Sequence, residues 1–189
     1  PAAHSSTSES IDHNHTRGDT MNLPQKEPVA EQPYLADDVT STPWAEAHGR
    51  LAEADSYWLA TVRPDSRPHL VPVLAVWVDG ALHFVASRTS RKAKNLTRNS
   101  HCVIAARRDA LDLVVEGTVA KVSDEAKLHR VAEVYMSKYG WPVTVRDGAF
   151  YADGAPTAGP PPYEVYEITP TMAFGLPTDE TFTATRWRF

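Results

Sequence analysis

Cysteine is almost absent from this chain, and its scarcity excludes or disfavours several kinds of cysteine-dependent structure and chemistry. The 189 residues include a single cysteine, Cys102, so no disulfide can form within the chain. A reducing, cytoplasmic setting is the simplest expectation. The predicted folded part has no Cys or His pair with metal-ligand spacing, and no arrangement predicts a catalytic triad. The sequence therefore favours neither a metal site nor nucleophilic catalysis.

Long apolar runs are missing as well. The longest, from Leu70 to Val78, is interrupted by Pro72 and is far shorter than the ~20 residues that span a bilayer. The formal net charge is −5, so the surface as a whole does not attract nucleic acid. We expect neither a membrane nor a nucleic-acid partner, and any anion site must be a local cluster of cations.

The first 40 residues differ in composition from the rest. They are rich in Ser, Thr, His, Pro and acidic residues, and Tyr34 is their only aromatic residue. Such a segment buries too little apolar surface to offset the entropy of ordering it. We therefore predict a disordered tail over 1–40, without a metal site at its histidines, and one folded domain over 41–189.

Apolar residues at every second position dominate the folded part. Leu111, Leu113 and Val115 begin one such series, and Asp79-Gly80 is a strong signal for a two-residue hairpin turn. Strands are predicted, in chain order, at 57–63, 69–78, 81–87, 101–107, 111–122, 163–169 and 181–189. With few helices and no βαβ rhythm, this pattern favours a mainly β fold that forms an antiparallel barrel.

Two helices and a long loop complete the prediction. Thr42 and Pro43 suit the N-cap and first position of a short helix. A longer amphipathic helix is expected between a cap at Ser123 and a stop at Gly140, with its apolar stripe in the core. The segment 141–162 is rich in Gly, Pro and Asp, and we expect a long loop that contacts substrate. Its aromatic candidates are Trp141, Phe150 and Tyr151.

One basic segment, 87–98, has the chemistry of a ligand site. It holds five cations and no acid, and it follows a predicted strand. Ser90 suits the N-cap of a short helix, and Arg91 and Lys92 would lie in its first turn, where cations are disfavoured by ~0.3–1 kcal/mol each. An anion such as a phosphate would complete this site. The alternatives are a solvated basic turn and a nucleic-acid site, which the lack of interleaved aromatics and the acidic chain disfavour.

The order of these elements resembles the pyridoxamine 5′-phosphate oxidase-like, FMN-binding split barrels. The resemblance covers the chain from about residue 44 to its C-terminus, and it implies an antiparallel split barrel that works as a homodimer. It rests on Ala60-Thr61-Val62, Pro68, the strand 71–76, Asp79-Gly80, the strand 82–87, Ser90-Arg91-Lys92, Asn95-Leu96 and Gly117.

The resemblance also implies a cofactor site between two subunits. Arg91 and Lys92 would hold the cofactor phosphate, with help from Ser90 and Arg88. The ring system would lie along two strands, against Val71, Pro72, Val73, Leu74, Ala75, Val76, Val85 and Ala86. The last strand would complete the other subunit's site through Arg186 and Trp187; the alternative for these two is a terminal strand with an aromatic packed on the core.

The sequence leaves the branch of the family open. The ending 185–189 differs from the substrate-binding tail of pyridoxamine phosphate oxidase itself, and Asp112 stands where the family often has an amide. The chain is closer to the branch that uses FMN or the deazaflavin coenzyme F-420. Lys94 and Arg98 could meet the longer anionic tail of that coenzyme.

An oxidoreductase is the function that the resemblance implies. The cofactor would transfer hydride to an unidentified small molecule, and we assign no catalytic residue. His69 and His83 lie on predicted strands, where a structural role competes with that of a proton donor, and Cys102 has the pattern of a buried apolar residue. The alternative function is binding or storage of flavin or haem without turnover.

Overall fold

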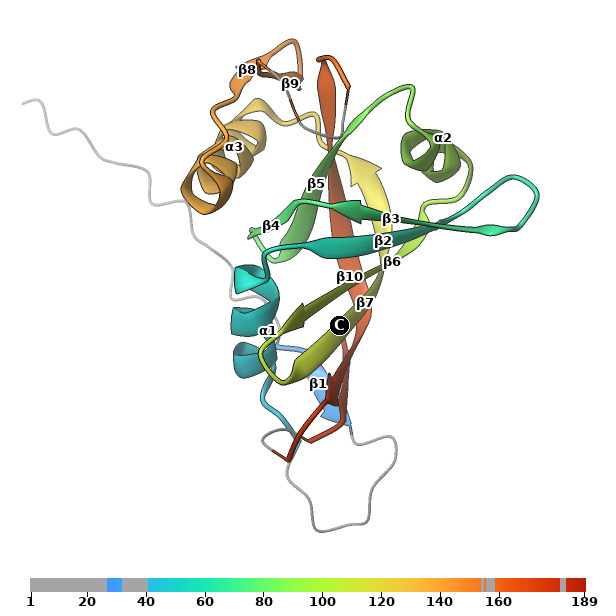
Figure 1. The fold of residues 1–189 in the computed structure, drawn as a ribbon, viewed down its shortest axis with the longest axis vertical. Helices are drawn as coiled ribbons and strands as arrows, with labels where there is room; N and C mark the ends of the chain where they lie inside the picture. The colour runs from blue at the N-terminus through green and yellow to red at the C-terminus, as the bar shows by residue number, and fades with distance from the viewer. Residues whose placement is uncertain (1–26, 32–40, 154, 156–158, 181–182) are drawn as a thin grey trace, which may run out of the picture.

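The computed structural model describes residues 27–31, 41–153, 155, 159–180 and 183–189. These residues form three helices and eleven strands (Figure 1). The helices are α1 (Trp44–Glu53), α2 (Arg91–Arg98) and α3 (Glu125–Tyr139). The strands are β1 (Val29–Glu31), β2 (Tyr57–Val62), β3 (Pro68–Val73), β4 (Ala75–Val78), β5 (Ala81–Ser87), β6 (His101–Arg108), β7 (Leu111–Lys121), β8 (Thr144–Arg146), β9 (Ala149–Tyr151), β10 (Tyr163–Pro177) and β11 (Thr185–Arg188). In this part of the chain no helix is long and apolar enough to cross a membrane.

Every pair of neighbouring strands is antiparallel. The main path of hydrogen-bonded neighbours is β1-β11-β10-β7-β6-β2-β3. β10 also pairs with β5, and β5 pairs with β4. β3 and β4 therefore end two branches of one sheet. The prediction of a mainly β, antiparallel fold is confirmed.

The predicted strand 69–78 is two strands that break at Leu74. β3 pairs with β2, whereas β4 pairs with β5, so the chain changes partner at this residue. The backbone carbonyls exposed by the break accept hydrogen bonds from α3: Tyr135 Oη donates to the Leu74 oxygen at 2.9 Å and Tyr139 Oη to the Ala75 oxygen at 2.8 Å. The alternation of apolar and polar residues does not indicate that a strand changes its pairing partner, so a single strand was predicted from the sequence.

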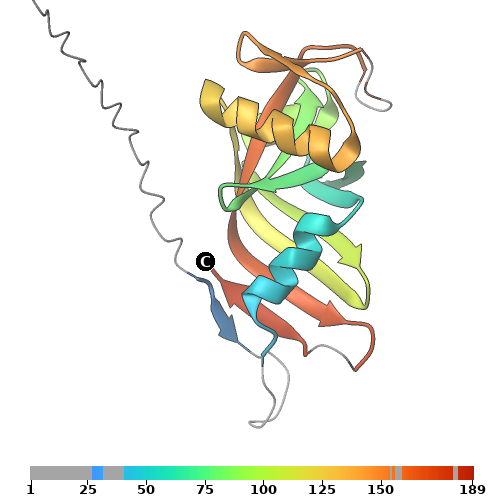
Figure 2. The ribbon, with the colours of Figure 1, turned by 90° about the vertical axis from the view of Figure 1, so that its left-hand side faces the viewer.

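The apolar core forms two clusters. The larger includes Leu51 of α1 and fully buried Trp187 of β11, and the smaller packs Leu128 and Tyr135 of α3 against the sheet. α1 and α3 cover one side of the sheet (Figure 2), so the predicted apolar stripe of α3 does face the core.

Two of the three predicted helix caps are wrong. Pro43, not Thr42, precedes α1, and the Thr42 hydroxyl donates instead to the Thr183 carbonyl at 3.1 Å. α3 is capped by Asp124, whose carboxylate accepts from the Lys127 amide at 2.6 Å, and not by Ser123. The cap of α2 is confirmed, as is the left-handed stop of α3 at Gly140.

The predicted loop 141–162 contains a hairpin. β8 and β9 pair across Asp147-Gly148, where both residues have positive φ. Phe150 is fully buried in the smaller core cluster, so this candidate for substrate contact is a core residue. The prediction of a long loop over 141–162 is wrong for this hairpin, because the Asp-Gly turn signal was not applied here.

The chain ends also depart from prediction. β10 runs to Pro177 instead of ending at 169, with an irregularity in its pairing to β7 between Pro170 and Met172. Gly117 lets β7 approach β10 there, since a Cβ would lie 2.5 Å from the Thr169 carbonyl oxygen. Within the predicted tail, β1 pairs with β11, so the tail prediction is wrong for 29–31; most of 1–40 and residues 181 and 182 lie outside the described residues.

Candidate functional site

A cavity of about 230 Å³ lies where four elements meet. The end of β3 and the middle of β5 form its strand walls, the first turn of α2 adds a cation, and the C-terminal end of α3 adds aromatic rings. Its lining residues are Pro72, Val73, Leu74, Val85, Lys92, Tyr135, Tyr139, Gly140, Trp141 and Ala155. The cavity therefore combines an apolar, aromatic interior with one positive charge.

The first turn of α2 has the predicted geometry of an anion site. The Ser90 hydroxyl accepts a hydrogen bond from the Ala93 amide at 3.3 Å, and the turn contains no acidic residue. Burial lowers the pKa of the Lys92 ammonium, and neither Arg91 nor Lys92 has an ion pair among the described residues. Partly dehydrated cations at the positive end of a helix favour a bound anion.

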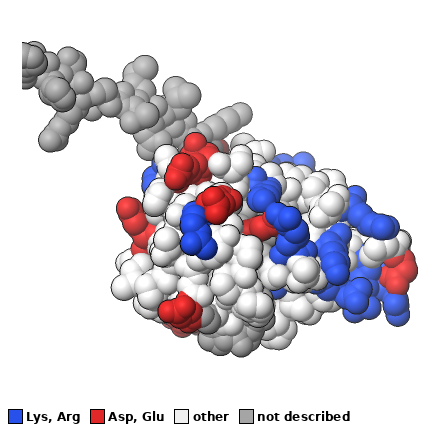
Figure 3. All heavy atoms as spheres, turned by 90° about the horizontal axis from the view of Figure 1, so that it is seen from above, with Lys and Arg blue, Asp and Glu red and all other residues white. Residues whose placement is uncertain are grey.

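More cations surround this turn than the basic segment contains. Burial lowers the pKa of His69, and the charges of Arg63, Arg91 and Lys92 lower it further. The β2–β3 turn, β3 and α2 therefore surround one positive region. Seen from above, blue side chains run along the side of the molecule where α2 and the β2–β3 hairpin lie (Figure 3). Arg63 was missed because it lies 28 residues before Arg91 in the sequence, and only the fold places both near His69.

The predicted ring-binding strands divide into lining and buried residues. Pro72, Val73, Leu74 and Val85 line the cavity, while Val71 is half-buried on the inner face of β3. Three further candidates have side chains enclosed in the core, and only their backbone can face a ligand: Ala75, Val76 and Ala86.

Arg88 points to a different partner. Its Nε donates to the Glu164 carboxylate at 3.0 Å, and Lys121 Nζ donates to the same oxygen at 2.8 Å. The other carboxylate oxygen accepts from Tyr166 Oη at 2.7 Å. Arg88 therefore has a counter-ion, unlike Arg91 and Lys92, and it lines a separate hollow beside Glu164.

The two candidates on β11 lie at the other end of the molecule from α2 and α3 (Figure 1). Trp187 is fully buried, its Nε1 donates to the Thr42 carbonyl at 3.1 Å, and its ring covers Gly175. Arg186 forms an ion pair with Glu31. The alternative interpretation, an aromatic packed on the core, is what the structure has for Trp187.

Other reactive groups are occupied or enclosed. His83 is fully buried, with Nε2 3.0 Å from Glu167 and Nδ1 3.2 Å from the Ala81 carbonyl. Burial raises the pKa of the Cys102 thiol to about 12, so it is a neutral, unreactive thiol. Asp112 is paired with Arg107, and the described residues contain no cluster of three potential metal ligands.

Tyr135, Tyr139 and Gly140 were not predicted as site residues. The apolar stripe of α3 was interpreted as core alone, and this is correct for most of it. The two tyrosines serve both purposes, because their hydroxyls bind the backbone at the Leu74 break while their rings reach the cavity. The helical spacing of apolar residues in α3 predicts which face is buried, but it does not indicate which end of that face borders a cavity.

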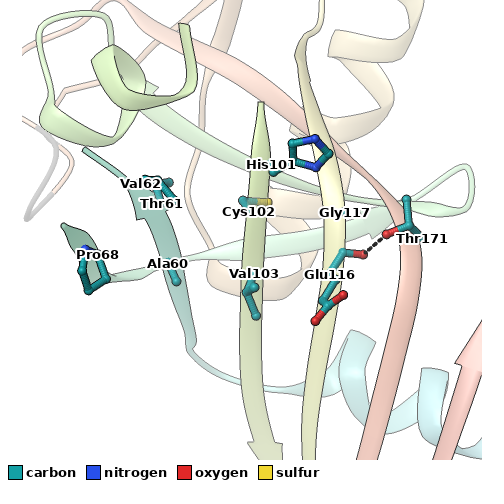
Figure 4. A pocket seen from close by; sticks show the side chains of 10 residues that line it. All are labelled: Ala60, Thr61, Val62, Pro68, His101, Cys102, Val103, Glu116, Gly117 and Thr171. Carbon is teal, nitrogen blue, oxygen red and sulfur yellow. Dashed lines mark hydrogen bonds between the residues drawn. The ribbon is translucent and has the colours of Figure 1, made fainter. Parts of the chain in front are cut away.

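A second hollow, of about 260 Å³, lies on the face formed by β2, β6, β7 and β10 (Figure 4). Ala60, Cys102 and Val103 contribute apolar lining, and Thr171 Oγ1 donates to the Glu116 carbonyl at 3.2 Å. Among its lining residues there is no Lys or Arg. It lacks the cations of the first cavity.

The described residues thus combine an antiparallel barrel with unpaired cations at the start of α2, beside an apolar cavity. The chain matches the pyridoxamine 5′-phosphate oxidase family over residues 44–176. It therefore belongs to this family, whose fold is the FMN-binding split barrel, and the predicted family and fold are confirmed. A comparison with curated proteins found no match.

Solved structures support the same fold. A conserved hypothetical protein from Mycobacterium tuberculosis, Rv2991, is 23% identical with a TM-score of 0.57, covering 78% of this chain and 90% of that one. An F420 reductase is 22% identical with a TM-score of 0.50, covering 67% and 94%. A heme binding protein from Mycobacterium smegmatis is 14% identical with a TM-score of 0.58, covering 76% and 57%. At these identities the likeness is one of fold.

Proposed function

We propose that this protein is an oxidoreductase that binds FMN, or the deazaflavin coenzyme F-420, in the cavity between β3, β5, α2 and α3. One observation carries the proposal: Lys92, in the first turn of α2, lines the same cavity as the apolar residues Val73 and Val85. A planar ring system needs apolar walls, and a phosphate needs cations with free N–H groups. The cavity offers both at neighbouring positions.

Each group of residues has a role in this proposal. Arg91 and Lys92 bind the cofactor phosphate through charge-assisted hydrogen bonds, and the Ser90 cap fixes the turn that presents them. Val73, Leu74 and Val85 pack against the ring system and exclude water from one side of it. The bound cofactor supplies hydride chemistry, so the protein contributes orientation and a dry pocket.

Storage or binding without turnover is the second candidate function. One structural neighbour is described as a heme binding protein and another as an F420 reductase, so the fold accommodates both roles. The cavity lining described here includes no His, Cys or Met to serve as an axial haem ligand. Its two tyrosine hydroxyls already donate to backbone carbonyls. This chemistry favours a flavin or deazaflavin over haem.

We also propose that the protein works as a homodimer. Trp58 and Leu70 lie on one face of β2 and β3 and are 50% and 58% exposed. Pro72 shares that face and lines the cavity, so a second copy seated there would also help to close the cavity. A contiguous apolar face of this kind is typical of an interface. A monomeric mass in solution with full cofactor occupancy would contradict this proposal.

The test is a pair of fluorescence titrations, one with FMN and one with coenzyme F-420. Tight binding followed by turnover, with NAD(P)H and a dye for FMN or with reduced F-420 and an enone, supports the oxidoreductase. Tight binding without turnover supports storage. A Soret band in the purified protein supports haem, and failure of both titrations would leave the basic segment as a solvated turn.

A further inference from the structure

Two residues of the β2–β3 hairpin, Arg63 and His69, lie near the cations of α2. β3 alternates between exposed and inward-facing residues, and His69, Val71 and Val73 share the inner face. Val73 lines the cavity at one end of this row. His69 lies at the other end, where the charges of Arg91 and Lys92 act on it. The row therefore leads from the proposed ring site to the proposed phosphate site.

A buried hydrogen-bond chain fixes the imidazole of His69. Asn95, on α2, donates through Nδ2 to Thr61 Oγ1 at 2.9 Å, and Thr61 Oγ1 lies 3.4 Å from His69 Nδ1. Asn95 and Thr61 are 1% and 2% exposed. Since the Thr61 oxygen already accepts from Asn95, its own hydrogen is available to Nδ1, which leaves the proton of a neutral imidazole on Nε2.

Nε2 of His69 is thus a donor without a partner among the described residues. Arg63 has the same character, because its Nε is buried and has no hydrogen-bond partner in this part of the structure. Its hairpin neighbour Arg67 contrasts with it: two Arg67 nitrogens donate to Asp65, at 2.9 and 2.7 Å. Of the two arginines, only Arg67 is hydrogen-bonded to a carboxylate; the charge of Asp65 acts on Arg63 without a hydrogen bond.

We propose that His69, through Nε2–H, and Arg63, through its guanidinium, complete the phosphate site formed by Ser90, Arg91 and Lys92. The proposal rests on the proposed function and deepens it by naming two further ligand-binding residues. Its ligand is a phosphate monoester dianion. The charged groups that face His69 are Arg63 from the β2–β3 turn and Arg91 and Lys92 from α2. All three are cations, and the Asp65 carboxylate that acts on Arg63 is bound to Arg67, so a bound anion would balance their charge.

This site makes phosphate binding depend on pH. Burial and the three cations lower the pKa of His69 in the free protein, so the ring is neutral near pH 7. A bound dianion favours the imidazolium and raises that pKa, so binding takes up protons. Affinity for FMN therefore increases as pH falls from about 8.5 to about 6.5, a range that lies above the ~6 second pKa of a phosphate monoester.

The first experiment compares FMN with riboflavin, which has the same ring and no phosphate, on matched variants. His69→Leu and Arg63→Met should each weaken FMN binding by about tenfold and leave riboflavin binding within about twofold. His69→Gln, which keeps an N–H donor, should recover part of the loss and flatten the pH dependence. The controls are His129→Gln, on the exposed face of α3, and Arg67→Met, the paired arginine.

A second measurement separates this inference from the proposed function. The His69 ring is titrated by NMR with and without saturating inorganic phosphate, and its pKa should rise on phosphate addition. If wild-type protein prefers FMN to riboflavin but His69→Leu and Arg63→Met bind FMN as well as wild type, the inference is wrong and the function stands. If wild-type protein shows no such preference and does not bind coenzyme F-420, the proposed function fails. An unmoved His69 pKa would overturn the inference in either case.

Discussion

The cations on the two sides of α2 differ in whether a carboxylate pairs with them. On the cavity side, Arg63, Arg91 and Lys92 form an unpaired cluster that has no ion pair among the described residues. The charge of Asp65 acts on Arg63, but that carboxylate is bound to Arg67. On the other side, the paired cluster of Arg88 and Lys121 shares the carboxylate of Glu164, which is 7% exposed. Both clusters would look alike in a plot of charge along the sequence. The buried carboxylate of Glu164 balances the charge of the paired cluster, which therefore has a structural role. The unpaired cluster has no such partner and is available to bind an anion.

Removal of the unpaired cations should have the largest effect. The double substitution Arg91→Ala and Lys92→Ala should weaken FMN binding by at least ~100-fold, because a phosphate loses two charge-assisted partners. Riboflavin binding should be unchanged. Thermal stability should be equal or slightly higher, since cations at a helix start are unfavourable. The matched control is Lys94→Ala with Arg98→Ala, later on the same helix; an equal loss of FMN affinity there would contradict the site.

Removal of the carboxylate should affect stability instead of binding. Glu164→Gln leaves Arg88 and Lys121 without their counter-ion, and we expect the free energy of unfolding to fall by about 1–3 kcal/mol. FMN affinity should change by less than about twofold. Denaturant unfolding measures the first effect and fluorescence titration the second. Asp112→Asn, which breaks the exposed pair with Arg107, is the control and should cost less than about 0.5 kcal/mol.

The same carboxylate should make stability depend on acid. Burial raises the pKa of Glu164, but hydrogen bonds from Lys121, Tyr166 and Arg88 outweigh it and hold the pKa below the usual 4.5. A depressed carboxylate pKa stabilises the fold above the unfolded-state value and loses this contribution as pH falls through the folded value. Wild-type stability should therefore decline below about pH 4.5. The decline should be shallower in Glu164→Gln, and parallel curves would contradict the assignment.

Arg88 should give the smallest effect on binding. The family resemblance suggested that it assists the phosphate, whereas its Nε is bound to Glu164 and its side chain is 80% exposed. Arg88→Ala should change FMN affinity by less than about threefold, because one exposed ion pair contributes little. A loss as large as that of Lys92→Ala alone would mean that Arg88 leaves Glu164 when the ligand binds, and would remove the distinction between the flanks.

Local patterns predicted most of the fold. The strand 81–87 and the Ser90 cap are as the sequence indicated, because alternation and capping are properties of adjacent residues. The break at Leu74 was missed because it reflects a change of pairing partner, which is not local. The hairpin at 147–148 carried a local signal that was overlooked in a segment rich in Gly and Pro.

The site was predictable only where its residues are neighbours in sequence. Arg91 and Lys92 stand in one run of charge, so the sequence identified them directly. Whether a cation already has a counter-ion depends on strand pairing, which brings Glu164 beside Ala86 and so within reach of Arg88. Trp187 was proposed as an accessible site residue because it lies near the C-terminus. The pairing of β10 with β11 instead places its ring against Gly175, in the core.

The most direct test of the central claim is the ratio of the dissociation constants of riboflavin and FMN for the wild-type protein. The two ligands share one ring system and differ by the phosphate alone. If the unpaired cluster binds that phosphate, FMN should bind at least ~100-fold more tightly at low salt, and the ratio should shrink as salt screens the charges. Equal dissociation constants at low salt would contradict the account.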